Sequence, residues 1–75
     1  MEEQWQDLRQ DILDLSEGNR MQWVRVKTLM FRAYDRGQTS NAEIGATLEW
    51  ASQEGFLEVR EGPPEFGAVR LTGAD

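Results

Sequence analysis

The stretch SNAEIGATLEWASQEGFLEV, Ser40 to Val59, decides the fold that we expect. Ser40 and Glu43 have the spacing of a capping box, which marks the first turn of a helix. Gly55 can take the left-handed conformation that ends a helix, and the alternating residues after it predict a strand. The apolar residues between these two ends recur at helical spacing and form one stripe: Ile44, Leu48 and Ala51.

Two more helices are expected before this stretch. The segment from residue 2 to about residue 16 has apolar residues in steps of three and four, which places them on one face of a helix. These residues are Trp5, Leu8, Ile12 and Leu15. A second helix is expected over residues 20–36, with Asn19 as its N-cap and Gly37 as its stop. Its broad apolar face, which includes Trp23, predicts that it lies at the centre of the core.

The segments FLEVR and AVRLT alternate between apolar and polar residues, which predicts the two strands of a hairpin over about residues 56–72. With 75 residues, the chain has room for one domain. The sequence therefore predicts a single α+β domain over residues 1–75. It consists of three helices (about 2–16, 20–36 and 40–54) followed by a C-terminal two-stranded β-hairpin.

The composition argues against catalysis and against cofactors. The chain contains no cysteine and no histidine, which excludes disulfides, the usual zinc sites and the commonest general base. Its carboxylates are scattered at helical surface spacings, and the sequence GPPEFG lacks the lysine of a phosphate-binding loop. We therefore expect no enzyme, no cofactor, no small-molecule substrate and no metal. The N-terminus has no basic leader, and no run approaches the ~20 apolar residues of a membrane span, so we expect a cytoplasmic protein.

The C-terminal half resembles a known superfamily. Three helices, the third running through EWASQEGFLEV into a hairpin that closes on VRLTGAD, resemble the winged helix-turn-helix superfamily, including its MarR-like and PadR-like branches. The resemblance covers about Ser40 to Gly73 and is carried by these positions: Leu48, Trp50, Gly55, Phe56, Leu57, Arg70, Leu71, Thr72 and Gly73. It implies a winged-helix-like fold in which residues 40–54 are the recognition helix, and a role in binding DNA.

The residues of that helix contradict a role in reading DNA. The side opposite its apolar stripe contains Ala42, Ala46, Glu49, Trp50 and Gln53, bordered by Glu43 and Glu54. DNA readers use chiefly Arg, Lys, Asn and Gln toward bases, and their affinity depends on cations that neutralise phosphates. An exposed tryptophan between alanines is instead typical of a surface that binds another polypeptide.

Two interpretations stand for each apolar feature. Trp50 either belongs to a protein interface or is covered by the first helix within the same chain. The stripe of Trp5, Leu8, Ile12 and Leu15 either packs inside the chain or joins two chains as a homodimer.

The best case for nucleic acid is the basic segment in the middle of the chain. Residues 20–36 have a net charge of +4, whereas residues 1–19 and 37–75 each have −5. Arg25, Arg32 and Arg36 are expected on one side of the second helix, where they either meet phosphates or pair with acids of the first helix. Arg60 and Arg70 could add to them from the hairpin, although the connector between its strands also carries Glu61, Glu65 and an apolar Phe66.

The sequence thus favours a non-enzymatic, winged-helix-like module that acts by protein–protein contact, either as a homodimer or with a regulatory partner. The alternative is a DNA-binding transcriptional regulator that docks through the basic stripe and the wing.

Overall fold

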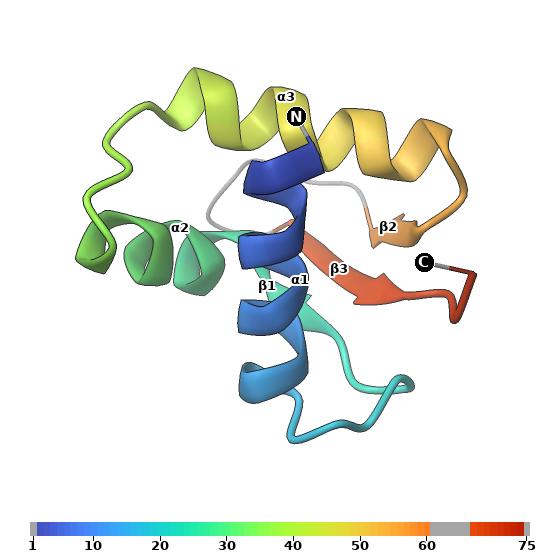
Figure 1. Cartoon of the computed structure of the whole chain (residues 1–75). Coiled ribbons are helices and arrows are strands. Elements are labelled where there is room, and N and C mark those ends of the chain that lie inside the picture. Colours follow the sequence, from blue (N-terminus) through green and yellow to red (C-terminus); the bar gives the residue numbers. More distant parts are fainter. Residues whose placement is uncertain (1, 61–66, 75) are drawn as a thin grey trace.

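The computed structural model describes residues 2–60 and 67–74. The elements follow the chain in the order α1 (Glu2–Leu15), β1 (Val24–Arg25), α2 (Val26–Asp35), α3 (Asn41–Gln53), β2 (Leu57–Arg60) and β3 (Ala68–Leu71) (Figure 1). The predicted α+β class is confirmed. The acidic connector with Glu61 and Glu65, and the side chain of Phe66, lie outside the described residues.

Within the described residues, the sheet has three antiparallel strands in the order β1-β3-β2, so the predicted two-stranded hairpin is wrong in its number of strands. β2 and β3 pair as expected, with Val59 opposite Val69. The third strand comes from residues 20–36, which do not form one helix: Val24 pairs with Val69 on the other side of β3, and α2 begins only at Val26. A strand of two residues leaves no period in the sequence, and its hydrogen-bond partners lie far along the chain.

The core lies between the three helices and one face of the sheet. Figure 1 shows α1 running across the domain, with its N-terminal end against α3 and its later turns over α2 and the sheet. The side chains that form the core are Trp5, Leu8, Ile12, Val24, Leu29, Ala33, Ile44, Leu48, Ala51, Leu57, Val69 and Leu71. The predicted buried stripe of α3 is therefore confirmed. Burial of this apolar set is the main source of stability in a chain without disulfides.

Local chemistry sets the two ends of α3. The Ser40 hydroxyl accepts a hydrogen bond from the Glu43 amide at 3.2 Å, as expected of an N-cap. The Glu43 carboxylate does not return to Ser40 but accepts from the Gln38 side chain at 3.0 Å. At the other end, Gly55 has φ +82°, and the Phe56 amide donates to the Ala51 carbonyl at 2.9 Å, which turns the chain into β2. No helix in the described ranges is long and apolar enough to cross a membrane.

Candidate interaction surfaces

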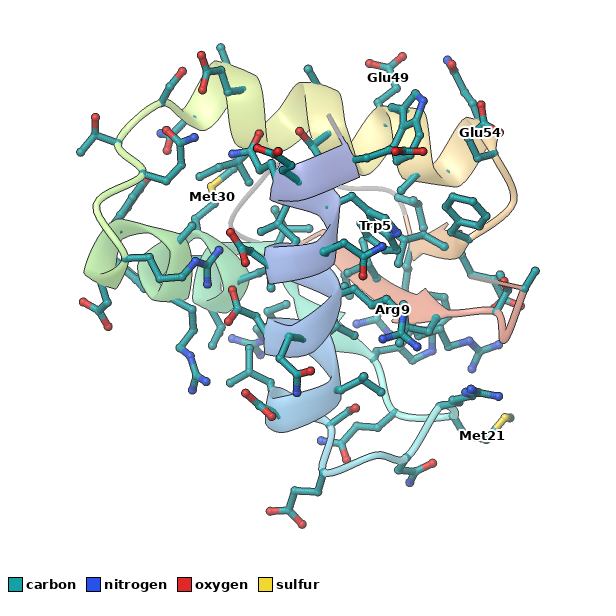
Figure 2. All side chains as sticks on the ribbon, in the orientation of Figure 1. Trp5, Arg9, Met21, Met30, Glu49 and Glu54 are labelled. Atoms are coloured by element: carbon teal, nitrogen blue, oxygen red, sulfur yellow. The ribbon has the colours of Figure 1, made fainter. Side chains whose placement is uncertain are left out.

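The first candidate surface is the side of α3 that faces away from the core. Ala42, Glu49 and Gln53 are exposed there, and Ala46 and Trp50 are half-buried beside them. Figure 2 shows Glu49 on the side of α3 turned away from α1. The bordering Glu43 and Glu54 are also exposed, and α3 contains no lysine and no arginine. This outward side is therefore acidic, with one aromatic ring at its edge.

Trp50 is partly packed within the chain. Its ring meets Phe56 edge to face, with centroids 5.8 Å apart and planes at 73°. Phe56 in turn stacks on the buried Trp5, at 6.1 Å and 15°. The three rings link α1, α3 and the turn before β2. Because Trp50 is half-buried, this packing leaves part of the residue exposed, and the half-buried Ala46 lies one helical turn earlier.

The apolar stripe of α1 is used inside the chain. Trp5, Leu8 and Ile12 are exposed by only 2%, 0% and 1%, and Leu15 packs against the same core. The interpretation of this stripe as a homodimer interface is thus wrong for the folded chain. The physical reason is that α2, α3 and the sheet together offer the stripe a continuous apolar surface, which leaves almost none of it for a second molecule.

The predicted basic stripe on the second helix does not form. Arg36 donates to the buried carboxylate of Asp11 on α1, and Arg32 reaches Asp14 at 3.4 Å and Asp11 at 4.0 Å. These two arginines therefore connect α2 to α1, one of the two interpretations that the sequence left open. Arg25 lies outside the helix, on the two-residue strand β1, and so does not extend the line of Arg32 and Arg36.

Arg25, Arg60 and Arg70 instead come together on the outer face of the sheet. Residues directly opposite one another in a sheet share a face. Ala68 on β3 pairs with Arg25 on one side and with Arg60 on the other, so these three residues share a face. Arg70 is two residues further along β3, on the same face, and pairs with Glu58. The Arg70 Nε donates to the Glu58 carboxylate at 2.6 Å, which neutralises one of the three cations.

Trp23 completes this basic face, and the sequence reasoning missed it. The guanidinium carbons of Arg70 and Arg60 lie 4.3 Å and 5.2 Å from the centroid of its ring, within the range of cation–π contacts. Helical periodicity placed Trp23 in the core. The only sequence clue to the contrary was the alternation of Trp23, Val24 and Arg25, too short to identify a strand.

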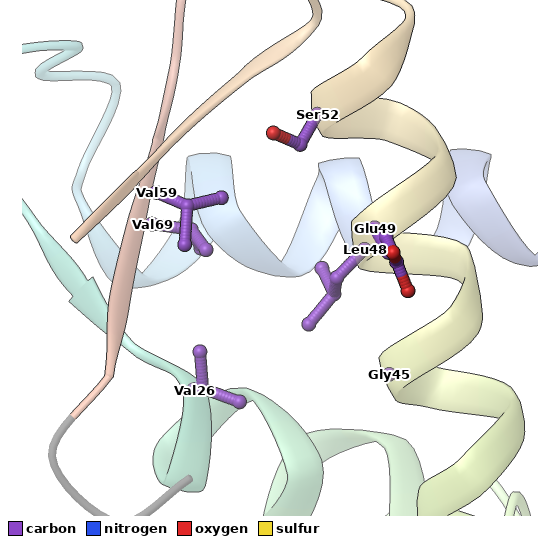
Figure 3. A pocket seen from close by; sticks show the side chains of 7 residues that line it. All are labelled: Val26, Gly45, Leu48, Glu49, Ser52, Val59 and Val69. Atoms are coloured by element: carbon purple, nitrogen blue, oxygen red, sulfur yellow. The ribbon is translucent and has the colours of Figure 1, made fainter. Parts of the chain in front are cut away.

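A groove of about 470 Å³ separates α3 from the inner face of the sheet. Its lining is mostly apolar and consists of Val26, Gly45, Leu48, Glu49, Ser52, Val59 and Val69. Figure 3 shows Val59 and Val69 facing Leu48 across this space. Val59 remains 47% exposed, which is unusual for a valine on the inner face of a sheet.

Comparison of the chain with models of protein families, with curated proteins and with solved structures found no match. Among residues 2–60 and 67–74, no group of three or more acidic side chains is placed to hold a metal ion.

Proposed function

We propose that this chain is a non-enzymatic, winged-helix-like module that binds a protein partner through the outward side of α3. One observation carries the proposal: that side presents Glu43, Glu49 and Glu54 to solvent, without any cation on α3, next to the partly exposed Trp50. The winged-helix-like description is supported by the passage from α3 through Gly55 into the antiparallel pair β2 and β3, which is the part of the sequence that carries the resemblance.

The charge of α3 argues against its insertion into a DNA groove. Each phosphate contact of a DNA-binding protein normally comes from a cation or a neutral donor. Here three carboxylates would approach the phosphates at close range, while the net charge of −6 repels the polyanion at longer range. A protein partner has no such charge restriction, and it can bury the indole of Trp50 in an apolar pocket.

The ring of Trp50 suits this role because it is both anchored and accessible. Its contact with Phe56 restricts the rotamers of the indole, so little conformational entropy is lost when a partner covers the exposed part. Ala46 lies one helical turn earlier and has a small side chain, which permits close approach of a partner backbone. The alanine and the tryptophan together form the apolar centre of a surface with an acidic rim.

The proposal can be tested by crosslinking in the cell that makes the protein. A photoreactive phenylalanine analogue at Gln53 should give adducts with protein, because Gln53 is exposed beside Trp50. The same analogue at Met21, which is 72% exposed on the loop before β1, is the matched control and should not give the same adducts. Trp50→Ala should remove the Gln53 adducts while circular dichroism still shows a folded chain. Adducts with DNA at Gln53 would refute the proposal.

A nucleic-acid-binding regulator is the second candidate, and it is favoured by the gathering of Arg25, Arg60 and Arg70 around Trp23. Of the five arginines that the sequence suggested, Arg32 and Arg36 already pair with acids of α1. The three on the sheet would have to supply the contacts. Titration of salt against random duplex DNA distinguishes this function, because affinity that depends on phosphates falls steeply as salt rises. No binding at low salt and high protein concentration would eliminate it.

A further inference from the structure

Among the described residues, β2 pairs with β3 on one side and has no strand on the other. We propose that two copies of the chain associate through antiparallel pairing of their β2 strands, which joins two three-stranded sheets into one. This proposal does not depend on the function assigned to α3. It rests on the backbone of β2, on the exposed Val59 and on the charges that flank it.

The backbone groups of β2 alternate between the two sides of the strand. The Thr72 amide donates to the Phe56 carbonyl at 3.1 Å, and this pair continues the register in which Leu57 lies opposite Leu71. In an antiparallel ladder every second pair exchanges hydrogen bonds. The N–H and C=O groups of Leu57 and Val59 therefore point away from β3. In the described part of the sheet, β2 has a neighbour on one side only, so these groups face an open edge.

The only protection that the side chains of β2 give this edge comes from Glu58 and Arg60, whose charges are opposite in sign. Natural edge strands are commonly blocked by lysine, proline or a bulge. The described strand, with the sequence LEVR, contains none of these. Its central Val59 is 47% exposed at the rim of the groove beneath α3. A strand added at this edge would cover Val59 and close one side of the groove.

Charge selects one register for a symmetric pair of β2 strands. When Val59 lies opposite its own copy, Glu58 of each chain lies opposite Arg60 of the other, on the outer face of the sheet. The two Val59 residues then exchange a pair of backbone hydrogen bonds, and their side chains meet on the inner face. A shift that places Glu58 opposite its own copy, or Arg60 opposite its own copy, puts like charges side by side, which destabilises a sheet. The complementary register is thus the favoured one.

The existing contacts of both charged residues are compatible with this pairing. Glu58 accepts from Arg70 through one carboxylate oxygen, and a carboxylate has acceptor capacity for a second donor. The Arg60 guanidinium lies over the Trp23 ring, and a guanidinium donates from its edge while its face rests on an aromatic ring. Both side chains lie on the outer face, at the strand that forms the edge.

A charge-exchange experiment tests the proposal. Sedimentation equilibrium of the unmodified chain, up to millimolar concentration, should show a monomer–dimer equilibrium. Glu58→Arg and Arg60→Glu should each weaken self-association at least about tenfold, because each places two like-charge pairs across the strands. An equimolar mixture of the two variants should recover association, since the two cations of one chain then face the two carboxylates of the other. Arg25→Glu is the matched control, because it makes the same charge change on β1, away from this edge.

Hydrogen exchange of the unmodified chain tests the same interface without substitution. The amide of Val59 should exchange more slowly as the protein concentration rises, because it donates to its own copy across the edge. Three results would overturn the proposal: exchange of Val59 that does not depend on concentration, a monomer at every concentration, or a dimer that both charge variants leave intact. Trp50→Ala should leave this dimer unchanged, so failure of the α3 surface and failure of the β2 surface give different results.

Discussion

Substitution of Asp11 by asparagine tests how α1 is held on α2. The Asp11 side chain is 9% exposed and pairs with Arg36, whose side chain is 34% exposed, and with Arg32, at 42%. Loss of one partner from a fully buried ion pair costs about 3–5 kcal/mol, whereas an exposed pair contributes about 0–1 kcal/mol. Because the carboxylate is buried but both guanidiniums can be rehydrated, we expect Asp11→Asn to lower the free energy of unfolding by about 2 kcal/mol.

The assay is urea unfolding followed by tryptophan fluorescence, with thermal unfolding as a second measurement. For a domain of this size, 1 kcal/mol corresponds to about 4–8 °C in the melting temperature, so we expect a decrease of about 8–16 °C. The total stability of such a domain is about 4–11 kcal/mol, so the variant remains folded. Asp14→Asn is the control: Asp14 also pairs with Arg32, but its side chain is 49% exposed, and it should cost at most about 0.5 kcal/mol.

Equal stability losses for the two variants, or no loss for Asp11→Asn, would refute this reasoning. Equal losses would mean that the burial of Asp11 does not set the strength of its ion pairs. No loss for Asp11→Asn would mean that Asp11 does not engage Arg32 and Arg36 in solution. In that second case both cations would be available to phosphates, and the nucleic-acid candidate would gain support. The experiment therefore bears on function as well as on stability.

Substitutions at three further positions test local features of the fold by urea unfolding. Ser40→Ala should cost about 1 kcal/mol, because the Glu43 amide loses its cap, and Ser40→Asp should preserve it; equal loss for both would contradict the capping role. Gly55→Ala should lower the free energy of unfolding by about 1 kcal/mol, because alanine is strained at the φ of +82°. No atom lies within 4 Å of the added methyl group, so no clash adds to this cost. An unchanged stability would show that the turn relaxes. Gln4→Met should lower the free energy of unfolding by less than about 1 kcal/mol, or should raise it. The reason is that the buried Gln4 Nε2 has no hydrogen-bond partner among the described residues, while Thr47 keeps its bond to a backbone carbonyl. A larger loss would show that this amide is satisfied in solution.

The parts of the fold that local chemistry determines could be predicted from the sequence. The ends of α3 follow from one hydroxyl at Ser40 and one glycine at position 55, both within a turn of the groups that they serve. The core stripes of α1 and α3 follow from periodicity, because a helix with one apolar face must bury it. These predictions need no knowledge of the rest of the chain.

The features that depend on distant pairing could not be predicted. Val24 is extended because it bonds to β3, and this contact moves Trp23 and Arg25 from a helix face to the outer face of the sheet. The sequence offered two interpretations for Arg32 and Arg36, and only the placement of α1 beside α2 decides between them. The groove beneath α3 is lined by residues of four elements, α2, α3, β2 and β3, and has no local sequence signature.

The distribution of charge leaves α3 acidic because the chain uses its arginines elsewhere. Arg32 and Arg36 join α1 to α2, and Arg70 joins β3 to β2, so these cations are used to hold the chain's own elements together. The carboxylates of α3 have no such arginine partner among the described residues.

Under the proposed function, a partner of α3 has to supply cations around an apolar pocket for Trp50. Attraction between that basic rim and the acidic helix would speed association and weaken with salt, whereas burial of the indole would persist at high salt. We therefore expect this surface to form a complex whose association rate falls as salt rises. Its dissociation rate should depend mainly on Trp50.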